Sequence, residues 1–258
     1  MRKLLIFLAL PILSGCASVA DAGRLTEVDI VSRTSGQTLQ TWRHGGRLYV
    51  AGTPGERYAV KLANRSGGRV LAVLSVDGVN AVTGETAAAR QSGYVLGPWQ
   101  SADIRGWRKS LDDVAAFYFT ALPDAYAART GRPDNVGVIG VALFRERVEP
   151  PVEPMPYGAS QKQAPVAPRA ADAAASEALG DARMKKEAER LGTGHGERLN
   201  DATRYTEFRR ASEAPTEVLT IYYDSRENLM ARGIIPRAPR HGQPQPFPGS
   251  FVPDPGPS

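Results

Sequence analysis

Val70-Leu71-Ala72-Val73-Leu74-Ser75-Val76 is an almost unbroken apolar run that follows a cluster of turn-forming residues. A second run of the same kind lies further along the chain, Val136-Gly137-Val138-Ile139-Gly140-Val141-Ala142-Leu143-Phe144. Runs of this length are typical of strands that are covered on both faces. The two runs are therefore predicted to be central strands of a packed β structure and to carry much of its core.

Shorter strands are predicted around these two runs. Residues 26–31 and 58–62 alternate polar and apolar side chains, as half-buried strands do. His44-Gly45-Gly46 joins two strand-like segments with the glycines that a tight hairpin needs, and Asn64-Arg65-Ser66-Gly67-Gly68 gives a second hairpin signal. Further strands are predicted over 93–96, 101–105 and 114–119, and a helical turn over 124–129.

The fold class predicted for residues 24–147 is mainly β, an antiparallel β-sandwich. No long amphipathic helix interrupts the series of strands, so parallel β-α-β units are not expected.

The rest of the chain is predicted to be peripheral to the sandwich, with one exception. The strand over 218–223 is expected to return and pair with the sandwich, because a lone strand is not stable. A short helix is expected after it, with Asp224 as the N-cap. The remaining segments are a proline-rich linker over 148–170, a peripheral helix over 171–190 within the 171–235 segment, and a disordered proline-rich tail over 236–258.

The N-terminus has the layout of an export signal. Met1-Arg2-Lys3 is followed by an apolar run that is too short to span a bilayer and then by small residues before Cys16, the single cysteine. Leu13-Ser14-Gly15-Cys16 resembles the lipobox of bacterial lipoproteins. The resemblance implies that residues 1–15 are a signal peptide and that Cys16 becomes the acylated first residue of a lipidated leader, 16–23. Two or three acyl chains anchor a protein persistently, whereas one holds it marginally.

Two further expectations concern the N-terminus. Ala17 follows Cys16, whereas in the lipoprotein family an aspartate at this position often retains the protein at the inner membrane. The resemblance therefore implies the periplasmic face of the outer membrane before the inner membrane. The alternative is an ordinary signal peptide or a membrane-embedded N-terminus with an incidental cysteine.

Composition limits the expected partners. Loss of Arg2 and Lys3 with the signal leaves 30 of the 32 Lys and Arg against 27 Asp and Glu, an excess too mild to predict nucleic-acid binding. Acylation of Cys16 would leave no thiol, so stability is expected from an apolar core and not from disulfides. The expected partners are the membrane, through acyl chains on Cys16, and an envelope protein or glycan.

No catalytic motif stands out in the sequence. It contains no G-x-S-x-G, S-x-x-K, P-loop or dinucleotide fingerprint, so neither a cofactor nor a metal site is predicted. Scattered carboxylates leave a glycosidase pair open. Residues 71–80 and 221–225 resemble exported bacterial proteins of unknown function, a likeness that implies no catalytic residue.

Gly93 to Arg108 is the first candidate site, because it places three aromatic residues and two arginines close together in the sequence. Exposed aromatic rings can stack on sugars or peptides, and arginines can add hydrogen bonds. The alternative is that the aromatic residues pack in the core, and Trp99, next to Pro98, is the one expected to be exposed. The candidate ligand-binding residues are Tyr94, Trp99, Arg105 and Trp107.

Leu191-Gly192-Thr193-Gly194-His195-Gly196-Glu197-Arg198 is the second candidate site. His195 between glycines, with Glu197 nearby, could serve as a base or a ligand. The alternative is a helix that ends with Gly192 as its C-cap, followed by a flexible glycine turn.

Residues 76–85 form the third candidate. Asp77, Asn80 and Glu85 among glycines suggest a calcium loop, but their spacing does not match that of an EF-hand, and Asp77-Gly78 is more simply a turn after a strand.

The function expected from the sequence is that of a lipid-anchored envelope protein with a binding or structural sandwich and no catalytic activity. The alternative is a periplasmic hydrolase that uses His195 with a carboxylate such as Glu197.

Overall fold

The computed structural model describes residues 25–148 and 190–237. The predicted signal peptide, Cys16 and its leader lie outside the described residues, as do most of the linker, the helix predicted over 171–190 and the tail from residue 238. The described residues are mainly β, with mostly antiparallel sheets, which confirms the predicted fold class.

One layer of the sandwich is a seven-stranded sheet with the order β2-β3-β13-β11-β5-β6, in which β7 also pairs with β5. The two apolar runs form β5 and β11, which are antiparallel neighbours in this sheet. The returning strand, β13, is antiparallel to β11 and parallel to β3. The strands of this sheet are β2 (Thr41–His44), β3 (Arg47–Gly52), β5 (Val70–Val76), β6 (Val79–Asn80), β7 (Tyr94–Leu96), β11 (Val138–Arg145) and β13 (Glu217–Ser225).

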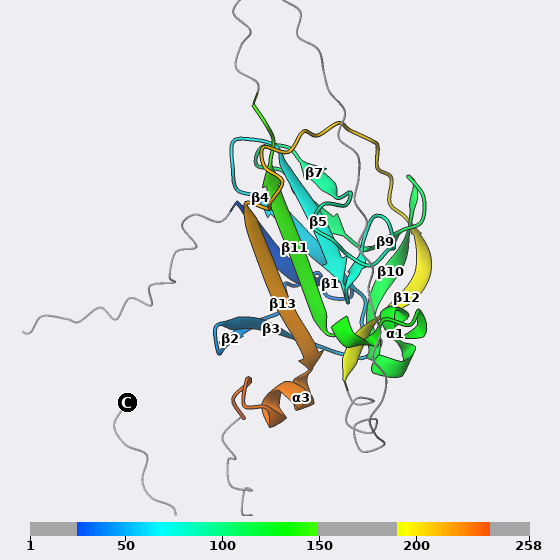
Figure 1. Ribbon diagram of the computed structural model, residues 1–258. Coiled ribbons are helices and arrows are strands. Elements are labelled where there is room, and N and C mark those ends of the chain that lie inside the picture. The colour runs from blue at the N-terminus through cyan, green and yellow to red at the C-terminus, as the bar shows by residue number, and fades with distance from the viewer. Residues whose placement is uncertain (1–24, 149–189, 238–258) are drawn as a thin grey trace, which may run out of the picture.

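The other layer consists of two three-stranded sheets, β1-β4-β8 and β12-β10-β9. An isolated bridge between Arg57 and Tyr118 connects them. Figure 1 shows β13, β11 and β5 in front of β1, with β9, β10 and β12 to the right. The strands of this layer are β1 (Thr26–Ser32), β4 (Tyr58–Asn64), β8 (Ser101–Ile104), β9 (Gly106–Arg108), β10 (Asp113–Ala121) and β12 (Leu191–Asn200).

The apolar core lies between the two layers. Ile30 and Leu62 from one layer and Leu74 and Val141 from the other belong to a single buried cluster, which also contains Phe117 of β10. β5 is buried on both faces, as predicted. Its alternate side chains, Leu71 and Val73, face away from this core and form a smaller cluster with Phe144, against which Phe208 packs.

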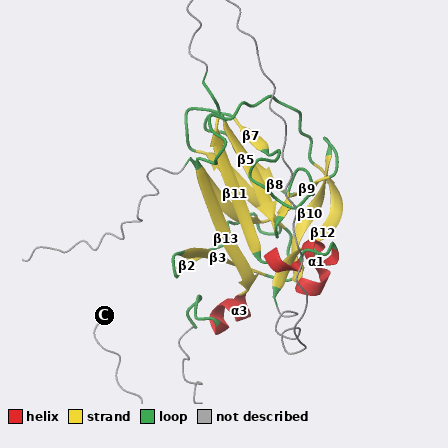
Figure 2. Ribbon diagram, viewed as in Figure 1, coloured by secondary structure: helices red, strands yellow, loops and turns green. Residues whose placement is uncertain are grey.

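Short helices lie at one end of the sandwich, the lower end in Figure 2. The helical turn predicted over 124–129 is confirmed, and the helices are η1 (Leu122–Asp124), α1 (Tyr126–Arg129), η2 (Pro133–Asn135) and α3 (Arg226–Ala231). The N-cap predicted for α3 was wrong by one residue. Ser225 is the N-cap and accepts a hydrogen bond from the Asn228 backbone amide at 3.1 Å, whereas Asp224 accepts from the Asn228 side chain and from the Leu191 amide.

One predicted hairpin is confirmed and the other is wrong. Gly45 and Gly46 adopt positive φ angles in the turn between β2 and β3. Residues 64–68, by contrast, lead from β4 in one layer to β5 in the other. The Asn64 side chain fixes this crossing, because its amide group donates to the carbonyl oxygens of Gly68 and Gly97 at 2.8 and 2.7 Å.

A buried polar network joins the two layers. Asp77 accepts hydrogen bonds from the Tyr223 hydroxyl at 2.5 Å, the Gly137 amide at 2.9 Å and the Thr193 amide at 2.8 Å. The Thr193 hydroxyl in turn bonds to the hydroxyls of Tyr58 at 2.6 Å and Tyr223 at 2.7 Å. Four side chains, named here the core network, thus pair with one another across the sandwich: Tyr58, Asp77, Thr193 and Tyr223.

The structure favours a tight turn over a calcium loop at residues 76–85. Asp77 and Gly78 both have positive φ angles in a tight turn between β5 and β6, as the simpler alternative predicted. The Asp77 oxygens accept protein donors, and the Asn80 oxygen accepts the amides of Val82 and Thr83. These oxygens are therefore already committed to protein hydrogen bonds.

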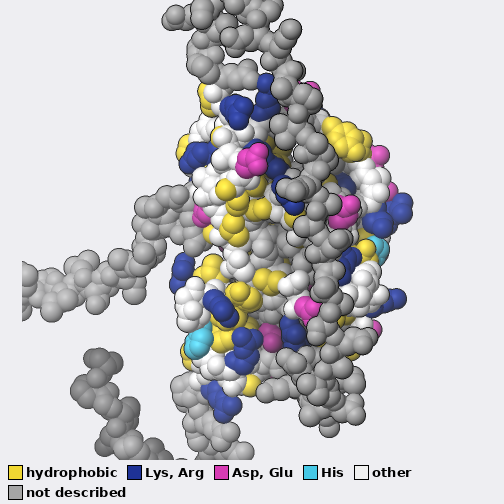
Figure 3. Space-filling model, in the orientation of Figure 1, with side chains coloured by type: hydrophobic (Ala, Val, Ile, Leu, Met, Phe, Trp, Pro, Cys, Tyr) yellow, Lys and Arg dark blue, Asp and Glu magenta, His cyan; other side chains and the backbone are white. Residues whose placement is uncertain are grey.

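Hydrophobic side chains also reach the surface of the larger sheet. Figure 3 shows them on the face of β11 and β13, among Lys and Arg side chains, and Val218 of β13 is 60% exposed. Within residues 25–148 and 190–237, no helix has the length and apolar character needed to cross a bilayer.

Candidate functional site: an arginine-lined cleft

An extended segment, residues 201–210, crosses from the end of β12 to the face of β5 and β7 (Figure 1). We call this segment the strap. Its first residues are fixed to the loop before β10, because the Asp201 amide donates to the Asp112 carbonyl and the Thr203 amide donates to the Leu111 carbonyl. The Asp201 carboxylate also forms ion pairs with Arg105 at 2.8 Å and Arg108 at 3.1 Å.

The other end of the strap is fixed to the larger sheet. The Arg69 guanidinium donates to the Thr206 hydroxyl at 2.9 Å and to the Glu207 carbonyl at 3.0 Å, and Phe208 packs on the outer face of β5. Between these two attachments, Arg204 and Tyr205 form no hydrogen bond to any other described residue, and Tyr205 is 88% exposed. The strap therefore arches over the sheet and leaves space beneath it.

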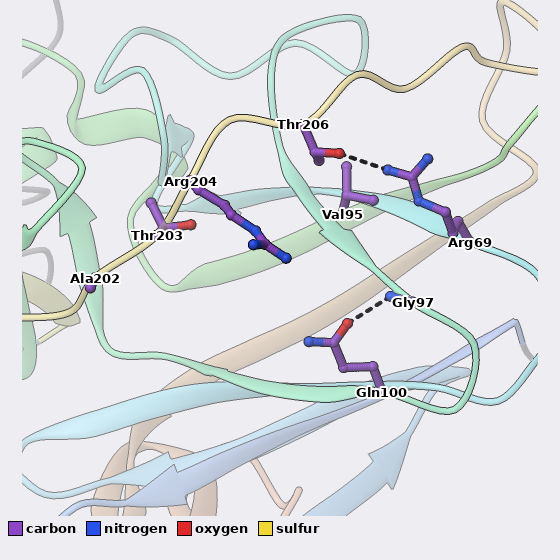
Figure 4. Close-up of a pocket in the computed structure, with 8 residues that line it drawn as sticks. All are labelled: Arg69, Val95, Gly97, Gln100, Ala202, Thr203, Arg204 and Thr206. Atoms are coloured by element: carbon purple, nitrogen blue, oxygen red, sulfur yellow. Dashed lines mark hydrogen bonds between the residues drawn. The ribbon is translucent and has the colours of Figure 1, made fainter.

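Two adjoining hollows occupy this space, with volumes of about 830 and 750 Å³. They share the strap residues Thr203, Arg204 and Thr206 and the β7 residue Val95, so the strap is a common wall. Figure 4 shows the smaller hollow, with the Arg204 side chain extending from the strap into it. We call the two hollows together the basic cleft.

The lining of the basic cleft is positively charged. Among the described residues, no Asp or Glu lines the cleft, and Glu207 of the strap is not among the lining residues. Two of its cations are compensated, since Arg69 pairs with Glu146 and Arg108 pairs with Asp201. Four others form no ion pair with any described residue: Arg90, Lys109, Arg204 and Arg210. Clustered charges of one sign in a cleft attract and hold ions of opposite charge.

Arg210 is held in place without losing its charge. Its guanidinium donates to the backbone carbonyls of Arg90 and Gln91 at 2.9 and 2.7 Å, and it lies 4.4 Å from the centre of the Phe144 ring. Carbonyl oxygens carry no formal charge, so this contact orients the guanidinium without neutralising it.

Tyr94 and Arg108 form a buried polar corner of the cleft. The Arg108 guanidinium lies 5.8 Å from the centre of the Tyr94 ring, and the side chain of Arg108 is only 10% exposed. The Tyr94 hydroxyl and the Arg108 Nε are buried and have no hydrogen-bond partner among the described residues. Burial raises the pKa of Tyr94, and Arg108, through its charge and its contact with the hydroxyl, opposes that rise only in part, so the hydroxyl stays protonated.

The four predicted ligand-binding residues do not form one platform. Tyr94 lines the cleft, and Arg105 holds the base of the strap through Asp201. Trp99 is 68% exposed, as predicted, but it lies outside the lining of the cleft and has a φ of 58°. Trp107 is 2% exposed and packs edge-on against Phe117, so the prediction that it could stack on a ligand was wrong.

The structure contradicts the turn predicted around His195. Residues 191–200 form β12, paired with β10, so Gly192 is not a helix C-cap. The His195 ring lies 5.3 Å from Tyr126 and 6.4 Å from Trp107. It lines a separate hollow of about 310 Å³ beside Asp124 and Arg129.

His195 and Glu197 have different surroundings. Burial and the charges of Lys109 and Arg129 lower the pKa of His195, whereas Glu197 pairs with Arg57 at 2.7 Å. No hydrogen bond joins the His195 ring to a carboxylate among the described residues. His195 and Glu197 are therefore not joined by a hydrogen bond, whereas Asp124 lines the same hollow as His195.

Sequence reasoning missed the strap, which supplies two of the four uncompensated cations. The signal was present in Arg204-Tyr205-Thr206-Glu207-Phe208-Arg209-Arg210, where three arginines flank two aromatic and two polar residues. A polar segment of this kind between two strands could have been predicted to contact a ligand, but not to lie beside Tyr94.

Neither the comparisons with known proteins nor the placement of possible metal ligands adds a candidate site. No family model, curated protein or solved structure matches the chain. Among the described residues, no group of three or more His, Cys, Asp or Glu side chains is placed to hold a metal ion.

Proposed function

We propose that this chain is a lipid-anchored cell-envelope protein whose β-sandwich is a binding module, and that the basic cleft is its surface for an anionic ligand. The anchor is supported by the likeness of Leu13-Ser14-Gly15-Cys16 to a lipobox, and Ala17 favours the periplasmic face of the outer membrane. The partners are the membrane, through acyl chains on Cys16, and an anionic envelope glycan or protein.

The observation that carries the binding proposal is the charge of the cleft. Within the part of the chain that the structure describes, four cations without ion-pair partners line a hollow that no carboxylate lines. A protein gains no stability by holding such charges together, because like charges repel one another. An anion bound between them would relieve that repulsion.

The anchor is tested by labelling cells with radioactive palmitate. We expect the wild-type chain to be labelled and to sediment with membranes, and Cys16→Ala to be unlabelled and either unprocessed or soluble. Normal labelling and membrane retention of Cys16→Ala would overturn the anchor.

The cleft is tested by thermal unfolding of the full lipidated chain in uncharged, non-sugar detergent micelles. Pyrophosphate and citrate should each raise the melting temperature more than sodium chloride of the same ionic strength, because they bind the folded state. The Arg90→Gln/Arg204→Gln variant should lose this response. Arg43→Gln is the matched control, since Arg43 is exposed on β2 and outside the cleft. Equal responses in all three proteins would contradict the proposal.

A further inference from the structure

We infer that the ligand of the basic cleft is a sugar-like ring that carries at least two phosphate groups. This inference rests on the proposed function, because it names the ligand class of the same cleft. Four features of the lining carry it: the number of uncompensated charges, the kind of cation, the mixture of hydroxyl and apolar groups, and the size of the cleft.

The number of charges requires a multiply charged ligand. Arg90, Lys109, Arg204 and Arg210 together present four positive charges that no described carboxylate balances. One phosphomonoester carries a charge of about −1.5 to −2 at pH 7. Two such groups would therefore balance the cleft, whereas a single carboxylate would leave most of its charge uncompensated.

The kind of cation favours phosphate. Three of the four uncompensated residues are arginines, whose planar guanidinium groups bind phosphate oxygens through paired hydrogen bonds. Arg108 and Arg210 are held in fixed positions, by Asp201 and by two backbone carbonyls respectively. A tetrahedral phosphate offers oxygens in several directions and can engage more than one of these groups, whereas the two oxygens of a carboxylate lie in one plane.

The neutral part of the lining suits a ring with hydroxyl groups. Leu71, Tyr94 and Phe208 supply apolar and aromatic surface, while Thr83, Ser92 and Thr203 supply hydroxyls that can both donate and accept. A sugar ring presents the same combination, with C–H groups on its faces and hydroxyls at its edge.

The size of the cleft agrees with such a ligand. Pockets of about 300 to 1,000 Å³ enclose most of the surface of a small molecule, and the larger hollow measures about 830 Å³. The phosphorylated ring could be a free sugar phosphate or the headgroup of a lipid, since both present the same chemistry to the cleft.

The test uses isothermal titration of the full lipidated chain in micelles of a polyoxyethylene detergent, which contains no sugar. The probes are inositol 1,4-bisphosphate, inositol 1-phosphate, myo-inositol and citrate. We expect the bisphosphate to bind at least about tenfold more tightly than the monophosphate or citrate, since hydrogen bonds between charged groups are the stronger ones, and myo-inositol not to bind. Arg90→Gln/Arg204→Gln should weaken the bisphosphate by about tenfold or more, and Arg43→Gln should not weaken it.

The outcomes separate this inference from the proposed function. If citrate binds as tightly as the bisphosphate and the cleft variant weakens both, the cleft is an anion site and the phosphorylated ring is wrong. If no anion binds, or if the cleft variant binds like the wild type, the proposed cleft function falls as well.

A second arm identifies the source of the ligand. Phosphatidylinositol 4-phosphate in the same micelles carries a 4-phosphate monoester and links its ring to acyl chains through a 1-phosphate diester, and glycerophosphoinositol 4-phosphate is its matched free headgroup. If the lipid displaces the soluble bisphosphate at a lower concentration than the free headgroup does, the ligand is a lipid. If the lipid and the free headgroup displace it at the same concentration, the ligand is a soluble molecule. Failure of the lipid to displace the bisphosphate at any concentration also indicates a soluble ligand, so each result assigns the source.

Discussion

The core network and the basic cleft both contain clustered polar side chains, but these side chains are paired within the protein in the network and are largely unpaired in the cleft. In the core network the Asp77 carboxylate and the Thr193 hydroxyl are each satisfied by buried protein donors and acceptors. In the cleft, Arg90 and Arg204 have no ion-pair partner among the described residues. The difference supports the proposal that the network stabilises the fold, whereas the cleft binds a ligand.

The contrast predicts where mutations act. Removal of one member of a satisfied buried network leaves other members unpaired, which lowers stability. Removal of an exposed and unpaired cation leaves no group unsatisfied, so stability stays almost constant while binding changes.

The largest expected effect is that of Asp77→Ala on stability. This change leaves the Gly137 amide, the Thr193 amide and the Tyr223 hydroxyl without their buried acceptor. We expect a loss of about 4 kcal/mol in the free energy of unfolding, measured by urea denaturation. Asp103→Ala, at an exposed aspartate of β8, is the control. A loss no larger than that of the control would show that the core network does not stabilise the fold.

The second effect is a dependence of stability on pH. Burial raises the pKa of Asp77 from 3.8 to about 6, so the folded chain holds this proton more tightly than the unfolded chain. The contribution of Asp77 to stability is therefore greatest below about pH 4 and falls as the pH rises to about 7, by about 3 kcal/mol in total.

Urea denaturation between pH 4 and 7.5 measures this effect as the difference between the wild type and Asp77→Asn, which does not titrate. Tyr58 and Tyr223, which face Asp77, remain neutral over this range because burial raises the pKa of both hydroxyls. A difference that stays constant, or that grows in favour of the wild type as the pH rises, would contradict the prediction.

A smaller effect distinguishes the two tyrosines of the core network. The Tyr223 hydroxyl bonds to both Asp77 and Thr193, whereas the Tyr58 hydroxyl bonds only to Thr193. We expect Tyr223→Phe to cost about 2 kcal/mol and Tyr58→Phe about 1 kcal/mol. The reverse order in chemical denaturation would show that the hydrogen bonds are not arranged as described.

The smallest expected effect on stability is that of Arg204→Gln. The side chain is exposed on the strap and bonds to no described residue, so the free energy of unfolding should change by less than about 0.5 kcal/mol. A loss above about 1 kcal/mol would assign Arg204 to the fold, and the contrast between the two regions would fail.

Much of the fold was predictable from the sequence because hydrophobic pattern determines which strands are buried. The runs at Val70–Val76 and in β11 predicted central strands, and the segment after Glu217 predicted a strand that returns to the sandwich. β12 was missed because Gly192, Gly194 and Gly196 suggested a flexible turn.

The glycines of β12 have a packing role that only the tertiary structure reveals. A Cβ atom on Gly194 would lie 2.2 Å from the Tyr118 ring, and one on Gly192 would lie 2.5 Å from the Ala125 side chain. Alternate glycines therefore keep one face of the strand open to close neighbours, an arrangement that local propensity does not encode.

The candidate site was less predictable than the fold. Of the predicted residues, Tyr94 lines the cleft and Arg105 pairs with Asp201 at the base of the strap, because aromatic and arginine residues cluster there in the sequence. Trp107 was misassigned, since nothing in its local sequence distinguishes a buried ring from an exposed one. The contribution of Arg204 and Arg210 depends on the path of the strap across β5 and β7, which is set by contacts with residues far away in the sequence.

The central claim is most directly tested by measuring binding and stability on the same two variants. The account predicts that Arg90→Gln/Arg204→Gln unfolds at the wild-type urea concentration but binds inositol 1,4-bisphosphate about tenfold more weakly. It also predicts that Tyr223→Phe unfolds at a lower urea concentration but, while folded, binds the bisphosphate with wild-type affinity. A cleft variant that is destabilised and binds normally, or a network variant that is stable and binds weakly, would contradict the account.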